Sequence, residues 1–133
     1  MNNSSPAKDL GLLVLRVGIG LIFIMHGYPK LMGGQEKWLW LGNQMVYLGI
    51  TFAPTVWGFL AAAAECIGGG MLVLGLGTRL AAFLMACVMI VAIVMHITIG
   101  DLFTVYSHPL AILIVFVSLF ISGAGAYSVD NVL

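Results

Sequence analysis

The sequence predicts an all-α integral membrane protein that folds as a four-helix transmembrane bundle. The chain has 133 residues, of which 62% are hydrophobic and 8% charged, whereas soluble domains carry about 25% charged residues. It contains four apolar runs, each close to the roughly 20 residues that cross the hydrocarbon core of a bilayer. The runs lack the alternating pattern of barrel strands, so helices are the structure that satisfies their backbone in lipid.

We expect a single domain over residues 1–133, with spans at about 10–28, 55–76, 80–99 and 109–126. The first run is too long for a signal-peptide core, and we expect it to be a retained anchor. Gly77-Thr78-Arg79 is predicted to form the tight turn between the second and third spans, and the polar stretch 100–108 joins the third to the fourth. Four spans place both termini on one side of the membrane.

The connection over residues 29–54 is expected to be an interfacial amphipathic segment between the first two spans. It is too short to cross the bilayer, and it carries Trp38 and Trp40 beside Lys37. Aromatic residues next to a cation favour a helix that lies in the membrane interface. A re-entrant cap over the bundle is the alternative.

Arg16 and Glu65 are charged residues in the middle of the first two spans. Charges at that depth are costly and usually face the bundle interior or a water-filled cavity. Counting about 1.5 Å per residue, Arg16 lies roughly 18 Å and Glu65 roughly 15 Å from the face opposite the termini. We therefore predict an Arg16–Glu65 ion pair, which serves either as a structural lock or as part of a polar site for a quinone, an acid or a proton.

Small residues surround both charges. Ala61, Gly68 and Gly69 are spaced to share the helix face of Glu65, and Gly20 lies four residues after Arg16. Small side chains let membrane helices approach closely. The first two spans are therefore expected to pack tightly together.

His26, His96 and His108 all fall near the face opposite the termini, as does Lys30. Histidine carries protons near neutral pH and binds metals, so this layer is a candidate proton-active or quinone-head site. Ordinary interfacial packing is the alternative. No spacing such as HxxxH supports a metal, and we expect neither a metal nor haem. The sequence assigns no catalytic residue.

Charge counts bear on partners and orientation. The net charge is zero and no basic patch is visible, so no nucleic-acid partner is expected. Lys8 and Arg79 on the terminal side balance Lys30 and Lys37 on the other, which leaves the positive-inside count tied. Arg16 favours cytoplasmic termini if it reaches toward the terminal face.

The ordered set of polar and small residues resembles the DoxX family of small four-helix bacterial membrane proteins. The resemblance is carried by Arg16, His26-Gly27, Lys30-Leu31, Glu65, Gly68-Gly69, Gly75, Thr78-Arg79, Met95-His96, Gly100-Asp101, Ser107-His108, Gly123-Ala124-Gly125, Tyr127-Ser128 and Asp130. At Ala111 and Ala124 many relatives are expected to have Glu and Pro. The resemblance implies a bacterial inner-membrane protein, since some relatives are subunits of thiosulfate:quinone oxidoreductases and others are linked to redox stress.

Three functions are compatible with these features. The first is a redox-associated, quinone-linked membrane subunit that is at most one subunit of an oxidoreductase; its candidate polar site is Arg16, His26, Lys30, Glu65, His96 and His108. The second is a non-catalytic scaffold, and the third is a small transporter. Apart from a quinone, no cofactor is expected. The bilayer, a soluble or membrane redox subunit and further copies of the chain are the candidate partners.

Overall fold

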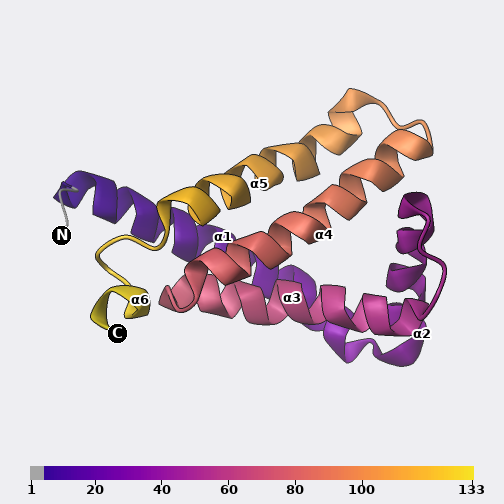
Figure 1. Ribbon diagram of the computed structural model, residues 1–133, viewed down its shortest axis with the longest axis horizontal. Coiled ribbons are helices and arrows are strands. Elements are labelled where there is room, and N and C mark those ends of the chain that lie inside the picture. The colour runs from indigo at the N-terminus through magenta and orange to yellow at the C-terminus, as the bar shows by residue number, and fades with distance from the viewer. Residues whose placement is uncertain (1–4) are drawn as a thin grey trace.

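The computed structural model describes residues 5–133, and its secondary structure over that range is entirely helical. The elements are α1 (Pro6–Met32), α2 (Gly34–Gly42), the 3-10 helix η1 (Asn43–Leu48), α3 (Pro54–Leu74), α4 (Thr78–Thr98), α5 (Phe103–Ser122) and the short α6 (Val129–Val132). Figure 1 shows the long helices side by side, with the short ones at the two ends of the bundle.

The predicted all-α membrane bundle is confirmed. Four helices, α1, α3, α4 and α5, are long and apolar enough to cross a membrane. Two of them differ from the expected bounds. α1 continues through Pro29 to Met32, one turn beyond the expected end, and α5 begins at Phe103 with Pro109 inside it. Pro29 lies in the last turn of α1 and Pro109 in the first two turns of α5, so neither interrupts the middle of a helix.

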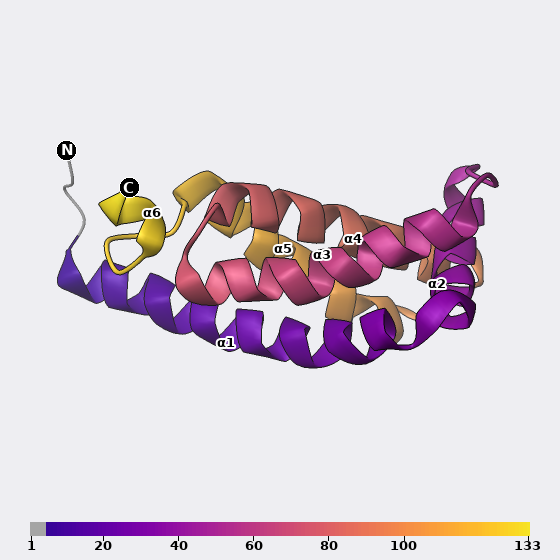
Figure 2. The same ribbon diagram turned by 90° about the horizontal axis from the view of Figure 1, so that it is seen from below.

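Neighbouring helices pack in the order α1, α3, α4, α5, with the closest association between α1 and α3. The bundle has two ends that are built from different elements, as Figure 2 shows. The terminal end holds the start of α1, the α3–α4 turn, the end of α5 and α6. The cap end holds the end of α1, α2, η1 and the α4–α5 connection.

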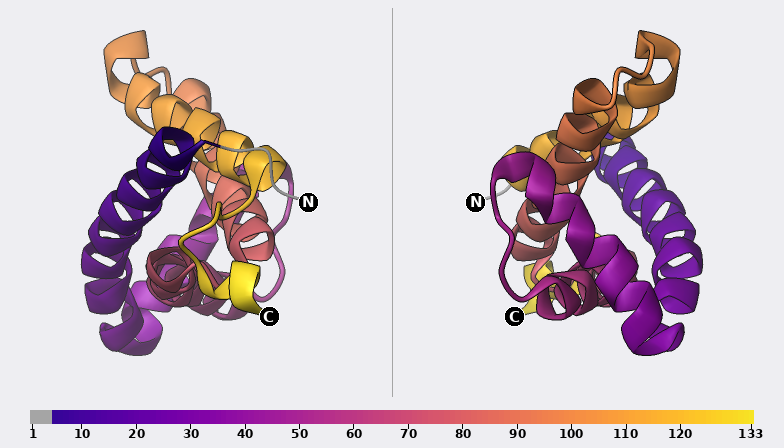
Figure 3. Two further views of the ribbon diagram at one scale, coloured as in Figure 1. Left: turned by 90° about the vertical axis from the view of Figure 1, so that its left-hand side faces the viewer. Right: turned by 90° about the vertical axis from the view of Figure 1, so that its right-hand side faces the viewer.

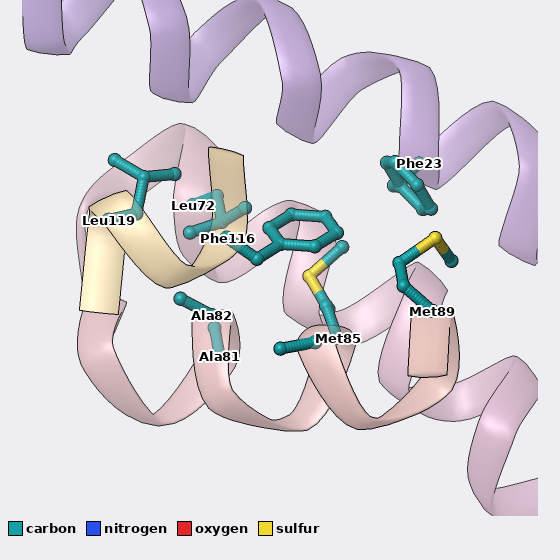
Figure 4. Close-up of a cluster of buried hydrophobic side chains, with 9 residues drawn as sticks. Phe23, Leu72, Ala81, Ala82, Met85, Met89, Phe116 and Leu119 are labelled. Atoms are coloured by element: carbon teal, nitrogen blue, oxygen red, sulfur yellow. The ribbon is translucent and has the colours of Figure 1, made fainter. Parts of the chain in front are cut away.

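A core of apolar side chains joins the long helices in the half of the bundle nearer the terminal end (Figure 4). The ring of Phe23 from α1 meets the ring of Phe116 from α5 edge-on at 5.2 Å between centroids. Leu72 and Met85 fill the space beside them and are fully buried. Most other large apolar side chains point outward, as expected where lipid replaces water around the bundle.

Glycines set the close contact between α1 and α3. A Cβ atom on Gly20 would lie 2.6 Å from the carbonyl oxygen of Gly69, and one on Gly27 would lie 2.5 Å from the backbone nitrogen of Cys66. The tight packing expected for these two spans is confirmed. It also fixes their register, because Gly20 lies level with Gly69 and Gly27 lies level with Cys66.

The connection between the first two spans folds into a helical cap. α2 and η1 cross the end of the bundle (Figure 3, right) and contact both α3 and α4. Backbone meets backbone where α2 crosses α3, since a Cβ on Gly58 would overlap the carbonyl oxygen of Trp38. The expected amphipathic segment is thus partly helical, and it covers one end of the bundle.

Candidate functional site

Arg16 is fully buried and bound entirely by main-chain oxygens. Its Nε donates to the carbonyl of Ala124 at 2.9 Å, its Nη1 to Leu72 at 2.8 Å and its Nη2 to Tyr127 at 2.6 Å. Leu72 lies in the last turn of α3, where carbonyls lack helical partners and the helix dipole is negative. The guanidinium therefore ties α1 to the end of α3 and to the segment after α5.

The predicted Arg16–Glu65 pair is wrong. Gly27 lies level with Cys66, and Arg16 is 11 residues away from Gly27 along α1, a rise of about 16 Å. Ending the first span at Tyr28 instead of Met32 accounts for about 6 Å of the error in the depth estimate. The rest comes from the register of the two helices, which places Gly27 and not Arg16 beside Cys66. Arg16 consequently reaches the terminal end, and Glu65 faces a different residue.

Glu65 pairs with Lys30. The Nζ of Lys30 donates to both carboxylate oxygens, at 2.9 Å and 3.2 Å. The side chain of Glu65 is 4% exposed and that of Lys30 is 30% exposed. The carboxylate of Glu65 is buried, so it needs the ammonium of Lys30 to balance its charge. The ammonium is itself partly exposed and therefore has one accessible side.

That open side faces a cavity of about 730 Å³ between the cap, α3 and α4. Both members of the pair line it. The remaining polar lining side chains are Lys37, Gln44 and the indoles of Trp40 and Trp57. The rest of the wall is apolar and comes mostly from α3 and α4. The size and character match pockets that bind small organic molecules, which are typically about 300–1,000 Å³ with a few polar groups.

The cap supplies one wall of this cavity. The ammonium of Lys37 sits 4.7 Å from the centroid of the Trp40 ring, which holds both residues at the pocket rim. The indole nitrogen of Trp57 is buried and finds no acceptor within residues 5–133. An unpaired donor in the wall is a group that a ligand can satisfy after a small side-chain movement.

The histidines do not form a common site. Across the described part of the chain, no hydrogen bond or ion pair joins His26, His96 and His108 to one another. His26 contacts the ring of Phe23, and the Nδ1 of His96 lies 2.7 Å from a carboxylate oxygen of Asp101. Over residues 5–133, no group of three or more His, Cys, Asp or Glu side chains is placed to hold a metal.

A second polar cluster closes the terminal end. Asp130 accepts hydrogen bonds from the backbone nitrogens of Gly77 and Thr78, at 2.7 Å and 3.0 Å. Burial, the largest influence, raises the pKa of Asp130, but these two hydrogen bonds and the charge of Arg16 outweigh it and hold the pKa below its ordinary value. The ionised carboxylate thus caps the start of α4.

Fold and site together define a small four-helix membrane protein with a mostly apolar pocket and one ion pair in its wall. The DoxX family model matches residues 11–98. The chain belongs to the DoxX family, as the resemblance indicated.

Two curated relatives are similar to this chain. The Bacillus subtilis protein named "Putative oxidoreductase CatD" is 34% identical over 65% of this chain, and the match spans 59% of the CatD sequence. A Haemophilus influenzae protein, named only "Uncharacterized protein", is 31% identical over 98% of this chain and 96% of its own length.

The sequence analysis named Lys30 as a candidate site residue at the end opposite the termini, but it did not predict its pairing with Glu65 or the pocket. The sequence does indicate that Lys30 lies on the buried face of α1. Arg16, Gly20, Phe23, Gly27 and Lys30 follow one another at spacings of four and three residues, which is the repeat of one helix stripe. Because the residues of this stripe face α3, Lys30 belongs with the buried face of α1. The pocket leaves no such signal, because it depends on where the cap folds.

Proposed function

We propose that this protein is a redox-associated, quinone-linked membrane subunit that acts with a partner. The carrying observation is the cavity of about 730 Å³ with the Lys30–Glu65 pair in its wall. Redox chemistry is supplied by the partner, and this chain supplies a binding site in the membrane. It is at most one subunit of an oxidoreductase.

The pair offers the two kinds of contact that a quinone head needs. The ammonium of Lys30 can donate a hydrogen bond to a quinone carbonyl, and the carboxylate of Glu65 can accept one from a quinol hydroxyl. Both side chains already line the cavity. An apolar wall excludes water, which strengthens each of these contacts.

The relative named "Putative oxidoreductase CatD" supports the redox part of this proposal. The printed name mentions no quinone and no partner, so those parts rest on the pocket. Arg16 is not part of this proposed site, because it is fully buried and does not line the cavity.

For location, we propose the bacterial inner membrane with cytoplasmic termini. The guanidinium of Arg16 reaches the terminal end, where Lys8 and Arg79 also lie, so three basic residues stand there against Lys30 and Lys37 at the other end. The positive-inside rule then favours the terminal end as cytoplasmic. The test is a C-terminal fusion to a reporter enzyme that is active only in the periplasm. Activity of this fusion would contradict the proposed orientation.

Photolabelling tests the site. A photoreactive quinone is expected to label wild-type protein in mild detergent, with cross-links in α3 and α4. Lys30→Gln and Glu65→Gln should each reduce labelling at least about fivefold, since one hydrogen bond to a charged group contributes about 1.5–3 kcal/mol. Lys8→Gln, at the other end, is the control and should label like wild type. Equal labelling of all four proteins would exclude the pair from the site.

A pull-down in mild detergent tests the partner. A co-purifying subunit that carries a redox cofactor is the expected result. The scaffold alternative predicts a partner whose activity survives the paired change Lys30→Leu with Glu65→Leu, whereas the proposed function predicts its loss while the complex stays assembled.

A further inference from the structure

The cavity is chemically divided along the bundle axis. The charged and amide side chains of the lining all lie between the level of Glu65 and the cap. They are Lys30, Lys37, Gln44 and Glu65. Beyond Glu65, toward the terminal end, the lining consists of apolar residues such as Ile67, Met71 and Leu84. Met71 is six residues past Glu65, so this apolar end extends about 9 Å along α3.

The apolar end opens sideways, between α3 and α4. Ile67 is 59% exposed and Leu84 is 43% exposed on the outer surface of the two helices. Both helices are long and apolar enough to cross a membrane. Their exposed side chains therefore meet acyl chains, and this side of the cavity is continuous with the hydrocarbon of the bilayer.

We propose that the ligand is a single-chain amphiphile that enters from the lipid between α3 and α4. Its apolar chain lies against Ile67, Met71 and Leu84, and its oxygen-bearing head lies beside the Lys30–Glu65 pair under the cap. This binding mode rests on the proposed quinone-linked function and specifies its substrate class as a quinone with a hydrocarbon tail.

Charge at the head end supports an acceptor-rich head. Two lysines, Lys30 and Lys37, face one glutamate, Glu65, among the lining residues, which leaves one net positive charge. Carbonyl oxygens suit such a site, and a cationic head does not. The cavity volume of about 730 Å³ is that of one drug-sized molecule rather than of a lipid with two long chains.

Thiol protection tests the tail position. In a background with Cys66→Ala and Cys87→Ala, Leu84→Cys places a thiol at the apolar end. Ile90→Cys is the matched control, because Ile90 is on the same helix and 44% exposed but does not line the cavity. The reagent is N-ethylmaleimide in detergent micelles. The probes are a quinone with a two-prenyl tail, the same head without a tail, and the two-prenyl alcohol without the head.

The tailed quinone should slow the reaction of Leu84→Cys at least fivefold and leave Ile90→Cys unchanged. The tailless quinone should bind, as measured by displacement of the photoreactive probe, without protecting Leu84→Cys. Equal affinity of both quinones with no protection would overturn the lateral binding mode alone. If the prenyl alcohol protects as well as the tailed quinone does, the proposed contact between the quinone head and the Lys30–Glu65 pair is wrong. Absence of binding by either quinone would overturn the proposed function itself, and this mode with it.

Discussion

Arg16 and Glu65, two charged residues buried in the long helices, are stabilised in opposite ways. Arg16 is surrounded by main-chain carbonyls and is fully buried. Glu65 is held by one lysine that keeps about a third of its side chain exposed, and both border a cavity. A charge that is enclosed by main chain from three segments holds those segments together. A charge with one movable partner can exchange that partner for a ligand.

The largest effect is expected at Arg16. Arg16→Leu leaves the carbonyls of Ala124 and Tyr127 without their donor and removes a bond to Leu72. Buried groups that lose a partner cost about 1–3 kcal/mol each, so we expect a loss of about 3 kcal/mol or more in unfolding free energy. Thermal unfolding in detergent measures it. Arg79→Leu, which removes an exposed residue with one long hydrogen bond, should change stability by less than about 0.5 kcal/mol.

The cap offers the next largest effect. A Cβ on Gly58 would overlap the carbonyl of Trp38, so Gly58→Ala should push α2 away from α3 at a cost of about 1–3 kcal/mol and weaken quinone binding. Gly70→Ala is the matched control in the same helix, because nothing lies within 4 Å of the added carbon. If both variants bind and unfold alike, the cap is not a wall of the site.

Coupling between charges distinguishes the two regions. Lys30→Leu strands the carboxylate of Glu65 and should cost about 1–2 kcal/mol, less than a fully buried pair because Lys30 is partly exposed. Adding Glu65→Leu should recover part of that loss. Arg16→Leu and Glu65→Leu should instead add within about 0.5 kcal/mol, because they share no partner. A coupling energy well above that limit between Arg16→Leu and Glu65→Leu would support the Arg16–Glu65 ion pair after all.

The smallest effect is a pH dependence at the terminal end. The pKa of Asp130 is lowered in the folded protein, so its contribution is present above the ordinary aspartate pKa and is lost as the pH falls through the lowered value. Protection of the Thr78 amide in hydrogen exchange should decline over that acidic range. Asp130→Asn should lack this component.

Sequence reasoning found what depends on composition and spacing. Run lengths predicted the four long helices, and Gly20 and Gly69 predicted the contact between α1 and α3. It failed where the partner is main chain, because the free carbonyls at the end of α3 carry no mark in the amino-acid sequence. It also failed for the pocket, since the path of α2 and η1 is decided by backbone contacts at Gly42 and Gly58 that no single run reveals.

The position of Arg16 also constrains how the protein is made. Arg16 belongs to α1, yet two of its three acceptors are 108 and 111 residues later in the chain. Until residues 124–127 have been synthesised, the guanidinium lacks most of its hydrogen bonds and must remain near water or lipid headgroups. The segment after α5 thus completes the burial of a side chain on α1, and a nascent chain that lacks this segment should hold α1 in the membrane less firmly than the full bundle does.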